Sequence, residues 1–211
     1  MKRARVLLAD DHVLILEGLR QVLEPHYEVV GAVRDGRSLV DSALRSKPDL
    51  IILDVTMPLL NGIDAAREIR KVLSRVKLLF VTVHASPVYL REALNAGATG
   101  YVLKSSAREE ILDAVTKVLS GETYVSPGVV GEDFDVSRWQ GGRPMKAAGP
   151  LTLREREILQ MVAEGRRAKE IASVLRISVK TVAFHRYNVK RKLGLGTIAQ
   201  LTKRAIDEGL I

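Results

Sequence analysis

The chain has 211 residues, of which 46% are hydrophobic and 27% are charged, a composition typical of a globular protein with enough sequence for two domains. It contains no cysteine, so disulfide bonds, thiolate catalysis and cysteine-ligated metal sites are excluded. Its apolar runs are far shorter than the ~20 residues that cross a bilayer, and its first residues form no signal-peptide core. We therefore expect a cytoplasmic protein with no membrane partner.

The formal net charge of +8 is unevenly distributed along the chain. Residues 1–120 hold 17 Lys and Arg against 15 Asp and Glu, residues 121–149 hold 3 against 4, and residues 150–211 hold 13 against 6. The basic excess is therefore concentrated in the C-terminal segment. This asymmetry predicts a polyanionic partner for that segment alone.

Short strand patterns alternate with amphipathic helical patterns over residues 1–120. The predicted strands are 5–9, 27–33, 50–54, 77–83 and 100–103, and the predicted helices are 13–23, 38–46, 62–73, 87–95 and 108–119. These alternations predict an α/β domain with a doubly wound five-stranded parallel sheet that is covered by helices on both faces. Such sheets bind their ligands outside the carboxyl ends of the strands.

The rest of the chain has a different pattern. Residues 121–149 are rich in glycine and proline without a sustained period, which predicts a linker. Residues 150–211 predict four short helices, at about 153–164, 169–175, 179–193 and 198–208, and the first begins with a capping-box pair, Thr152 and Glu155. We therefore expect one domain at 1–120, a linker at 121–149 and a second, smaller all-α domain at 150–211.

Three carboxylates follow two of the predicted strands. Asp10 and Asp11 come after the first strand and Asp54 ends the third, so the sheet is expected to bring them into one pocket. Like charges in close contact repel by roughly 1 to 4 kcal/mol per pair at intermediate effective dielectric, which favours a bound divalent cation or one protonated acid. The pocket therefore predicts a site for Mg²⁺ and a phosphoryl group.

The first 120 residues resemble the receiver domain of two-component response regulators, which has a flavodoxin-like fold. The resemblance rests on Asp10-Asp11, on LDVTMPLLNG at 53–62, on Thr82 in FVTVH at 80–84, and on GYVLK at 100–104. It implies that Asp54 accepts a phosphoryl group from the phosphohistidine of a sensor histidine kinase and becomes an acyl phosphate.

The resemblance also implies roles for the neighbours of Asp54. Asp11, Asp54 and the main-chain carbonyl of Thr56 would ligate Mg²⁺, and Asp10 would reach it through water. Lys104 would neutralise charge on the transferring phosphoryl oxygens. The expected chemistry is limited to the protein's own phosphorylation and dephosphorylation, so the chain is not expected to be an enzyme.

Thr82 and Tyr101 are the candidate switch residues. The Thr82 hydroxyl would swing toward the phosphoryl group, and the ring of Tyr101 would enter the space that Thr82 leaves. This movement would shift the surface formed by the fourth predicted helix, the fifth strand and the fifth helix between two packings. The alternative is that Tyr101 only fills the core.

Thr56 lies beside the path of an attacking water and should influence the lifetime of the phosphorylated state, in a direction that the sequence does not give.

Residues 151–195 resemble the LuxR-type helix-turn-helix of the NarL/FixJ group of response regulators. The matching residues are Leu151-Thr152, Arg154-Glu155, Gly165, Lys169-Glu170-Ile171-Ala172, Leu175, Ile177-Ser178, Thr181-Val182, His185 and Lys192-Leu193. The helix at 179–193 contains no acid, and Val182, Val189 and Leu193 would face the bundle. This leaves a basic face for the major groove of DNA.

The candidate DNA contacts are Lys169, Lys180, Thr181, Ala183, Phe184, His185, Arg186, Tyr187 and Lys190. Many relatives carry Asn where Ala168 stands and Lys where Ala183 stands, so two polar contacts are missing. Ala183 and Phe184 could instead pack on a thymine methyl, and Arg186 or Tyr187 could supply hydrogen bonds. The last helix is expected to pair two phosphorylated chains as a homodimer on an inverted-repeat site, with recognition helices ~10 base pairs apart.

The sequence thus predicts a transcription factor in which phosphorylation of Asp54 promotes dimeric, sequence-specific binding to double-stranded DNA. Two alternatives remain open: a DNA-binding regulator that does not depend on phosphorylation, and a phosphate-sink receiver that binds DNA weakly. The complete set of Asp11, Asp54, Thr82 and Lys104 argues against the first alternative. The missing polar contacts in the helix-turn-helix are the reason to keep the second.

Overall fold

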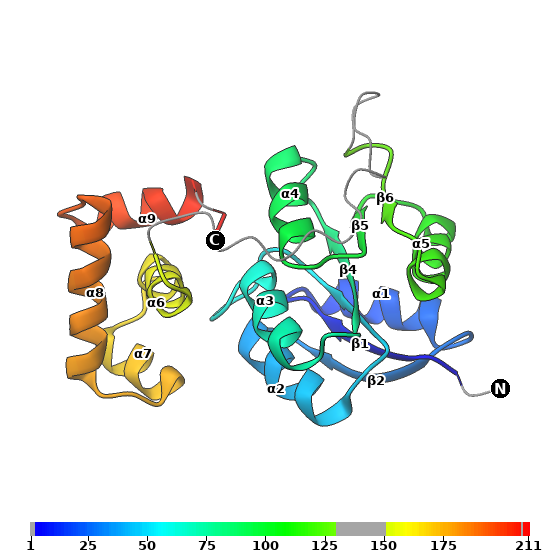
Figure 1. The fold of residues 1–211 in the computed structure, drawn as a ribbon, viewed down its shortest axis with the longest axis horizontal. Helices are drawn as coiled ribbons and strands as arrows, with labels where there is room; N and C mark the ends of the chain where they lie inside the picture. The colour runs from blue at the N-terminus through cyan, green and yellow to red at the C-terminus, as the bar shows by residue number, and fades with distance from the viewer. Residues whose placement is uncertain (1–2, 130–150, 208) are drawn as a thin grey trace. The chain divides into compact units, whose positions relative to one another are not determined.

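The computed structural model describes residues 3–129, 151–207 and 209–211, which belong to two units, one α/β and one all-helical (Figure 1). The α/β unit contains β1 (Arg5–Ala9), α1 (Val13–Leu23), β2 (Glu28–Val33), α2 (Gly36–Ser46), β3 (Leu50–Leu53), α3 (Gly62–Val72), β4 (Lys77–Thr82), α4 (Pro87–Asn95), β5 (Gly100–Leu103), α5 (Arg108–Ser120) and β6 (Tyr124–Val125). The helical unit contains α6 (Leu153–Ala163), α7 (Ala168–Leu175), α8 (Val179–Leu193) and α9 (Ile198–Asp207).

The sheet is parallel throughout, with the strand order β2-β1-β3-β4-β5-β6. The order reverses between β1 and β3, which makes the sheet doubly wound and places a ligand crevice at the carboxyl ends of these two strands. The predicted strand number was wrong, because the structure has six strands and not five. The sixth, β6, pairs with β5 and lies at the start of the segment predicted as a linker; residues 130–149 of that segment lie outside the described residues.

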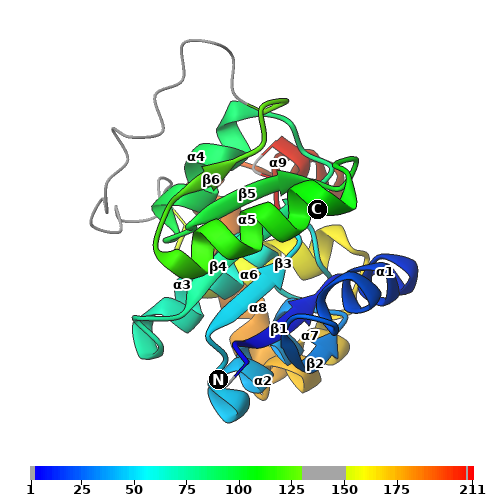
Figure 2. The ribbon, with the colours of Figure 1, turned by 90° about the vertical axis from the view of Figure 1, so that its right-hand side faces the viewer.

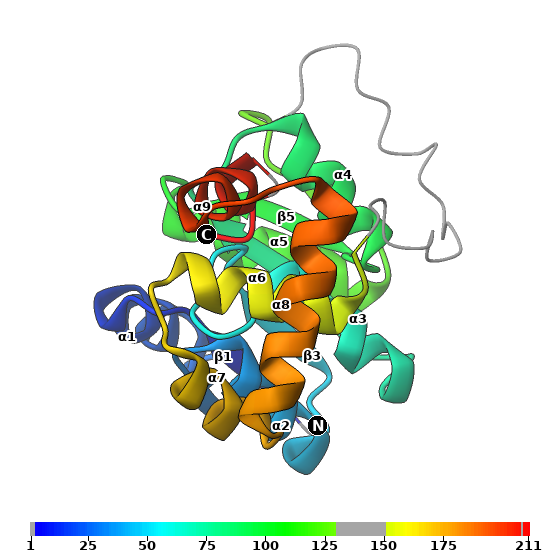
Figure 3. The ribbon, with the colours of Figure 1, turned by 90° about the vertical axis from the view of Figure 1, so that its left-hand side faces the viewer.

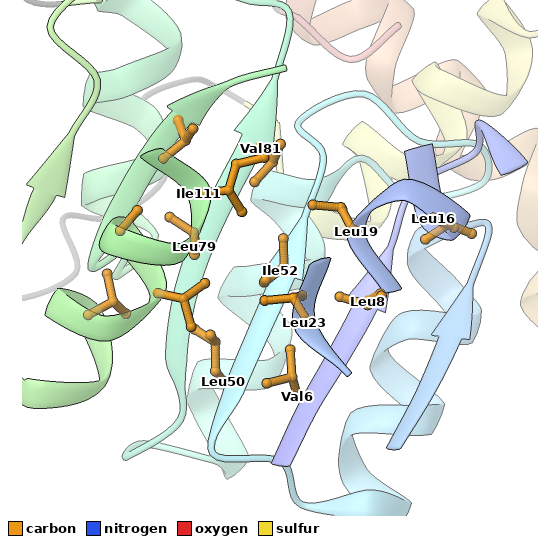
Figure 4. Packing of buried hydrophobic residues seen from close by; sticks show 14 residues of the cluster. Val6, Leu8, Leu16, Leu19, Leu23, Leu50, Ile52, Leu79, Val81 and Ile111 are labelled. Atoms are coloured by element: carbon orange, nitrogen blue, oxygen red, sulfur yellow. The ribbon is translucent and has the colours of Figure 1, made fainter. Parts of the chain in front are cut away.

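Helices cover both faces of the sheet, α1 and α5 on one face and α2, α3 and α4 on the other (Figures 1 and 2). The central strands are continuous apolar runs because both of their faces are buried. On the α1 and α5 side, Leu16, Leu19 and Ile111 pack against strand residues such as Ile52 and Val81 (Figure 4). This rigid layer fixes the strand ends that carry the polar residues.

The helical unit has its own hydrophobic core, in which α6 packs against α8 and α9, and α7 packs against α8 (Figure 3). The predicted capping box at the start of α6 is confirmed, because the Thr152 side chain accepts from the Glu155 amide and Glu155 accepts from the Thr152 amide. Val182 and Val189 are buried on the inner side of α8, and Leu193 packs against the same core. On α9, Leu201 and Ala205 are buried. No described helix is long and apolar enough to cross a membrane.

Candidate functional site

The carboxylates that follow β1 and β3 lie together at the carboxyl edge of the sheet. The parallel register pairs Ala9 with Leu53, so the next residues, Asp10 and Asp54, emerge side by side. Asp10 and Asp54 are buried, and one ligand atom from each of Asp10, Asp11, His12 and Asp54 lies within 4.8 Å of the others. The structure therefore brings the three predicted carboxylates into one cluster and adds His12.

Lys104, which follows β5, reaches across this edge to two of the carboxylates. Its Nζ lies 2.6 Å from Asp10 Oδ2 and 2.8 Å from Asp54 Oδ2, and only 8% of the side chain is exposed. Burial alone would lower the pKa of Lys104, but hydrogen bonds and charge attraction from Asp10 and Asp54 outweigh it and raise the pKa above 10.5. The ammonium therefore stays charged and offsets the repulsion between the two acids.

The remaining carboxylate oxygens show which partners the cluster still lacks. Asp54 Oδ1 accepts the Val55 amide at 2.6 Å, and Asp10 Oδ1 accepts the His12 amide at 2.9 Å. Asp11 Oδ1 is shielded from solvent and lies 2.7 Å from His12 Nδ1, but accepts no hydrogen bond in that geometry. His12 offers a nitrogen to this cluster, but its three carboxylates supply oxygens, one of them without a hydrogen bond, and this oxygen set fits a hard divalent cation such as Mg²⁺.

Gly62 begins α3 directly against the main chain of Asp54. A Cβ at this position would lie 1.8 Å from the Asp54 carbonyl oxygen, far inside any real contact, and the Gly62 amide donates to the Val55 carbonyl at 2.8 Å. The glycine is therefore required for the loop after β3 to return close to the Asp54 main chain. The loop holds Thr56, whose hydroxyl lies 2.8 Å from His84 Nε2.

His84, two residues after β4, joins the loop after β3 to the fifth strand. The hydroxyl of the fully buried Tyr101 donates to the His84 carbonyl at 2.8 Å, and the His84 amide donates to Thr82 Oγ1 at 3.4 Å. The His84 ring stacks on Tyr89 with centroids 4.2 Å apart. Burial first, and then the charges of Asp54 and Tyr89, raise the pKa of Tyr101 above 10.0. Tyr101 therefore lies inside the unit as a hydrogen-bonded neutral phenol.

His12 and His84 contact the site in the structure but were not predicted from the sequence. His12 was identifiable only as the residue next to Asp10 and Asp11, and His84 only by its place two residues after the candidate switch Thr82. From its place in the sequence alone, either histidine could as well face solvent as contact a site residue. Their contacts depend on the distance between two strand ends, which only the folded sheet fixes.

The candidate DNA contacts lie on α7 and α8 with different exposure. Lys169, Lys180, Ala183, Phe184 and Tyr187 are exposed, whereas Thr181, His185, Arg186 and Lys190 are partly buried. Some of the polar groups already have partners within the unit: the Thr181 hydroxyl lies 2.8 Å from Ser178 Oγ, and Lys190 Nζ donates to the Gly196 carbonyl at 2.8 Å. His185 Nδ1 is buried without a hydrogen bond to any described residue.

An ion pair ties the end of α8 to the start of α6. Lys192 Nζ donates to Glu155 Oε2 at 2.7 Å, the oxygen that also accepts the Thr152 amide. Burial alone would raise the pKa of Glu155, but hydrogen bonds from Lys192 and Thr152 outweigh it and lower the pKa below 4.5. Lys192 therefore contributes to the helical unit itself and is removed from the set of free cations.

A doubly wound parallel sheet with an acidic pocket at its switch point, followed by a basic helix-turn-helix, is the architecture of a two-domain DNA-binding regulator. The model of the response regulator receiver domain matches residues 6–116, and that of the bacterial regulatory proteins of the luxR family matches residues 149–205.

Two curated relatives match almost the whole chain. The transcriptional regulatory protein MctR of Rhizobium johnstonii is 38% identical over 99% of this chain and 96% of its own length. The response regulator UvrY of Escherichia coli is 32% identical over 97% of this chain and 94% of its own. A solved complex of the two-component response regulator RcsB with DNA has a TM-score of 0.58 at 26% identity, over 98% of this chain and 99% of that one.

The chain belongs to the response regulator family, as a member of the NarL/FixJ type with a receiver domain and a LuxR-type DNA-binding domain. It is a response regulator transcription factor.

Proposed function

We propose that Asp54 accepts a phosphoryl group from a sensor histidine kinase and that this modification controls DNA binding by the helical unit. The observation that carries the proposal is the Asp54 carboxylate itself, buried at the switch point with Lys104 Nζ 2.8 Å from one oxygen. In the transfer, a carboxylate oxygen of Asp54 forms a bond to phosphorus while the bond from phosphorus to the kinase's histidine nitrogen breaks. Lys104 neutralises charge on the transferring phosphoryl oxygens.

The donor set supports Mg²⁺ as the cofactor of this step. Asp11, Asp54 and the main-chain carbonyl of Thr56 would hold the ion, and Asp10 would reach it through water. When bound, Mg²⁺ supplies positive charge to the transferring phosphoryl group. The chain's own catalysis is then confined to its phosphorylation and dephosphorylation.

The switch residues are supported by contacts that phosphorylation would have to change. Thr82 is fully buried at the end of β4, and among the described residues its hydroxyl accepts one long bond, from the His84 amide at 3.4 Å, so it has hydrogen-bonding capacity for a dianionic group. Tyr101 is held inside by its bond to the His84 carbonyl. Movement of the Thr82 hydroxyl toward the phosphoryl group, with a change in the packing of the Tyr101 ring, would shift the surface made by α4, β5 and α5.

The partner of the helical unit is double-stranded DNA, with α8 in the major groove. This part of the proposal is supported by the charge of residues 150–211, 13 Lys and Arg against 6 Asp and Glu, and by the solved DNA complex of the similar RcsB. We assign residues 1–120 to the receiver, 121–149 to a linker and 150–211 to the DNA-binding domain, with β6 as an addition to the receiver sheet. Phosphorylated chains would pair through α9, where Ile198 and Ile206 are exposed, on an inverted repeat in the bacterial cytoplasm.

The test begins with the phosphoryl pocket. The full chain is incubated with acetyl phosphate and Mg²⁺, and intact mass is measured. We expect the mass of one phosphoryl group to be added, and the addition to be absent in Asp54→Asn and after chelation of the metal. Labelling that persists in Asp54→Asn would refute the assignment of the acceptor.

Regulation is tested separately from labelling. Operators selected from random-sequence DNA are titrated with the chain, with and without beryllofluoride as a phosphoryl mimic, over a range of salt concentrations. We expect tighter binding with beryllofluoride and a steep fall of affinity with salt, because counterions are released from the phosphates. Equal affinities would favour the phosphorylation-independent alternative, and absence of binding at low salt would favour the phosphate sink.

A further inference from the structure

The exposed face of α8 combines aromatic and basic side chains. Lys180, Phe184, Tyr187 and Arg191 follow one another at spacings of four, three and four residues, so they lie along one side of the helix. Phe184 is 60% exposed and Tyr187 is 62% exposed. The Arg191 guanidinium lies over the Tyr187 ring at 5.8 Å from its centroid, which restrains the ring on this face.

These two rings have no role in the core of the helical unit. Val182 and Val189 supply the buried side of α8, whereas Phe184 and Tyr187 stand on the opposite side. Single exposed apolar side chains are common on folded proteins and need no explanation. Two aromatic rings one turn apart, between cations on a helix that has no acidic residue, form a coherent surface for a polyanionic partner with an apolar feature.

The polar side chains of α8 are less available for reading base edges than the sequence indicates. Lys190 Nζ is bonded to the Gly196 carbonyl, and Lys192 Nζ is bonded to Glu155. Arg186 is partly buried, while the position next to Phe184 is the small Ala183. An aromatic ring cannot make the bidentate hydrogen bonds that identify guanine or adenine, but it can pack on the thymine methyl, the apolar group of the major groove.

We infer that Phe184 and Tyr187 determine the DNA specificity of this protein by packing on thymine 5-methyl groups, an inference that rests on the proposed DNA-binding function. The two residues are one turn apart, about 5 Å along the helix axis. Successive bases of one strand are about 3.4 Å apart. The rings therefore address neighbouring base pairs, and Ala183 leaves room for the helix backbone to approach the groove floor. The preferred half-site contains thymine at the positions that face Phe184 and Tyr187.

The experiment compares thymine with uracil, which differs only by the 5-methyl group. Operators are first selected from random-sequence DNA with the full chain in the presence of beryllofluoride. Each thymine of the half-site is then replaced singly by deoxyuracil, and the dissociation constant is measured by fluorescence anisotropy. We expect at least one position per half-site at which uracil weakens binding about fourfold, the factor that corresponds to burial of one methyl-sized group.

Substitutions on α8 test whether the Phe184 ring causes the difference between thymine and uracil. Phe184→Ala should weaken binding to the thymine operator and remove the difference between thymine and uracil at its position. The solvent-exposed ring can be removed without a cavity, and circular dichroism checks that the unit stays folded. Lys180→Ala is the matched comparison on the same helix face: it should weaken binding to both operators equally and reduce the salt slope by about 1, as a phosphate contact does.

Three results would overturn the inference, and they differ in their consequence for the DNA-binding function. Sequence-specific binding in which uracil equals thymine at every position would overturn methyl reading and leave the DNA-binding function intact. Failure to bind any DNA at low salt would overturn both. A thymine preference that persists unchanged in Phe184→Ala and in Tyr187→Ala would place the reading residue elsewhere and overturn the assignment.

Discussion

Replacing Lys104 with methionine should strongly destabilise the α/β unit. Lys104 Nζ lies 2.6 Å from Asp10 Oδ2 and 2.8 Å from Asp54 Oδ2, and the two carboxylates are 2% and 4% exposed. Methionine preserves most of the apolar stem but leaves two buried acids without their cation. Removal of one partner from a buried pair costs about 3–5 kcal/mol, because a charge is left uncompensated. We expect a loss of this size in the free energy of unfolding at neutral pH.

The matched control is Lys117→Met on α5. Lys117 Nζ also lies 2.8 Å from a carboxylate oxygen, that of Asp113, but the two side chains are 41% and 48% exposed. Exposed pairs of this helical spacing contribute about 0.3–0.5 kcal/mol. Lys117 Nζ also lies 5.2 Å from the centroid of the Tyr124 ring, so Lys117→Met removes one exposed ion pair and one ring contact, whereas Lys104→Met leaves two buried carboxylates without their cation. A much larger effect of Lys104→Met therefore reflects the buried charges.

Amide hydrogen exchange measured by mass spectrometry on the full chain is the suitable assay, because it reports the opening free energy of β3 and β4 separately from that of the helical unit. Adding Asp54→Asn to the Lys104→Met variant removes one of the uncompensated charges and should recover part of the loss. Mg²⁺ should also stabilise Lys104→Met more than the unchanged chain, because a second cation replaces the ammonium. Equal destabilisation by Lys104→Met and Lys117→Met would refute the argument that the ammonium holds the cluster together.

Three further predictions test other parts of the structure. Gly62→Ala places a Cβ against the Asp54 carbonyl and should lower the free energy of unfolding, measured by hydrogen exchange, by about 1–3 kcal/mol. Gly18→Ala is the control: this helical position has open space around it, so the substitution should raise the free energy of unfolding by about 0.5–1 kcal/mol. Because the pKa of Glu155 is lowered on folding, the carboxylate stabilises the helical unit above its ordinary pKa of 4.5, and this stabilisation is lost as the pH falls below that value. Thermal melts should show the loss in the unchanged chain but not in Glu155→Gln. Tyr101→Phe removes one buried hydrogen bond and should cost about 0.5–1.5 kcal/mol by exchange of β5; no change would show that this bond is not formed in solution.

The bounds of several elements follow directly from sequence pattern. The predicted ranges for β1, β5, α1, α4 and α8 are those of the structure, because apolar period and end signals agree there. Ser86 before Pro87 marks the start of α4, and Gly194, with φ of 66°, ends α8 in the left-handed region. These are local signals, so they can be read without knowledge of the fold.

The strand β6 could not be predicted in this way. Tyr124–Val125 is two residues long, too short to show a period, and it stands between Gly121 and Pro127 in a stretch that looks like a linker. Its position depends on bonds to other parts of the chain: the Tyr124 amide donates to the Thr99 carbonyl at 3.1 Å. A strand that is defined by its partner, and not by its own sequence, becomes visible only when β5 is in place.

Part of the candidate site could likewise be predicted from the sequence, and part of it could not. The strand ends that hold Asp10, Asp54 and Lys104 follow from the predicted sheet, so their meeting could be expected from the sequence. The link from Thr56 through His84 to Tyr101 could not, because it depends on how closely the loops after β3 and β4 approach each other. The contacts that restrain the candidate switch are therefore a property of tertiary structure.

This link sets the energy that a phosphoryl group must supply under the proposed function. Two hydrogen bonds, one between the Thr56 hydroxyl and His84 Nε2 and one from the Tyr101 hydroxyl to the His84 carbonyl, hold the resting arrangement, each worth about 1 kcal/mol net. A charge-assisted bond from Thr82 to a phosphoryl dianion would contribute about 1.5–3 kcal/mol, whereas Lys104 would exchange bonds that it already makes to Asp10 and Asp54. The two sides are of similar size, so under the proposed function phosphorylation of Asp54 would shift the balance between two packings of comparable free energy.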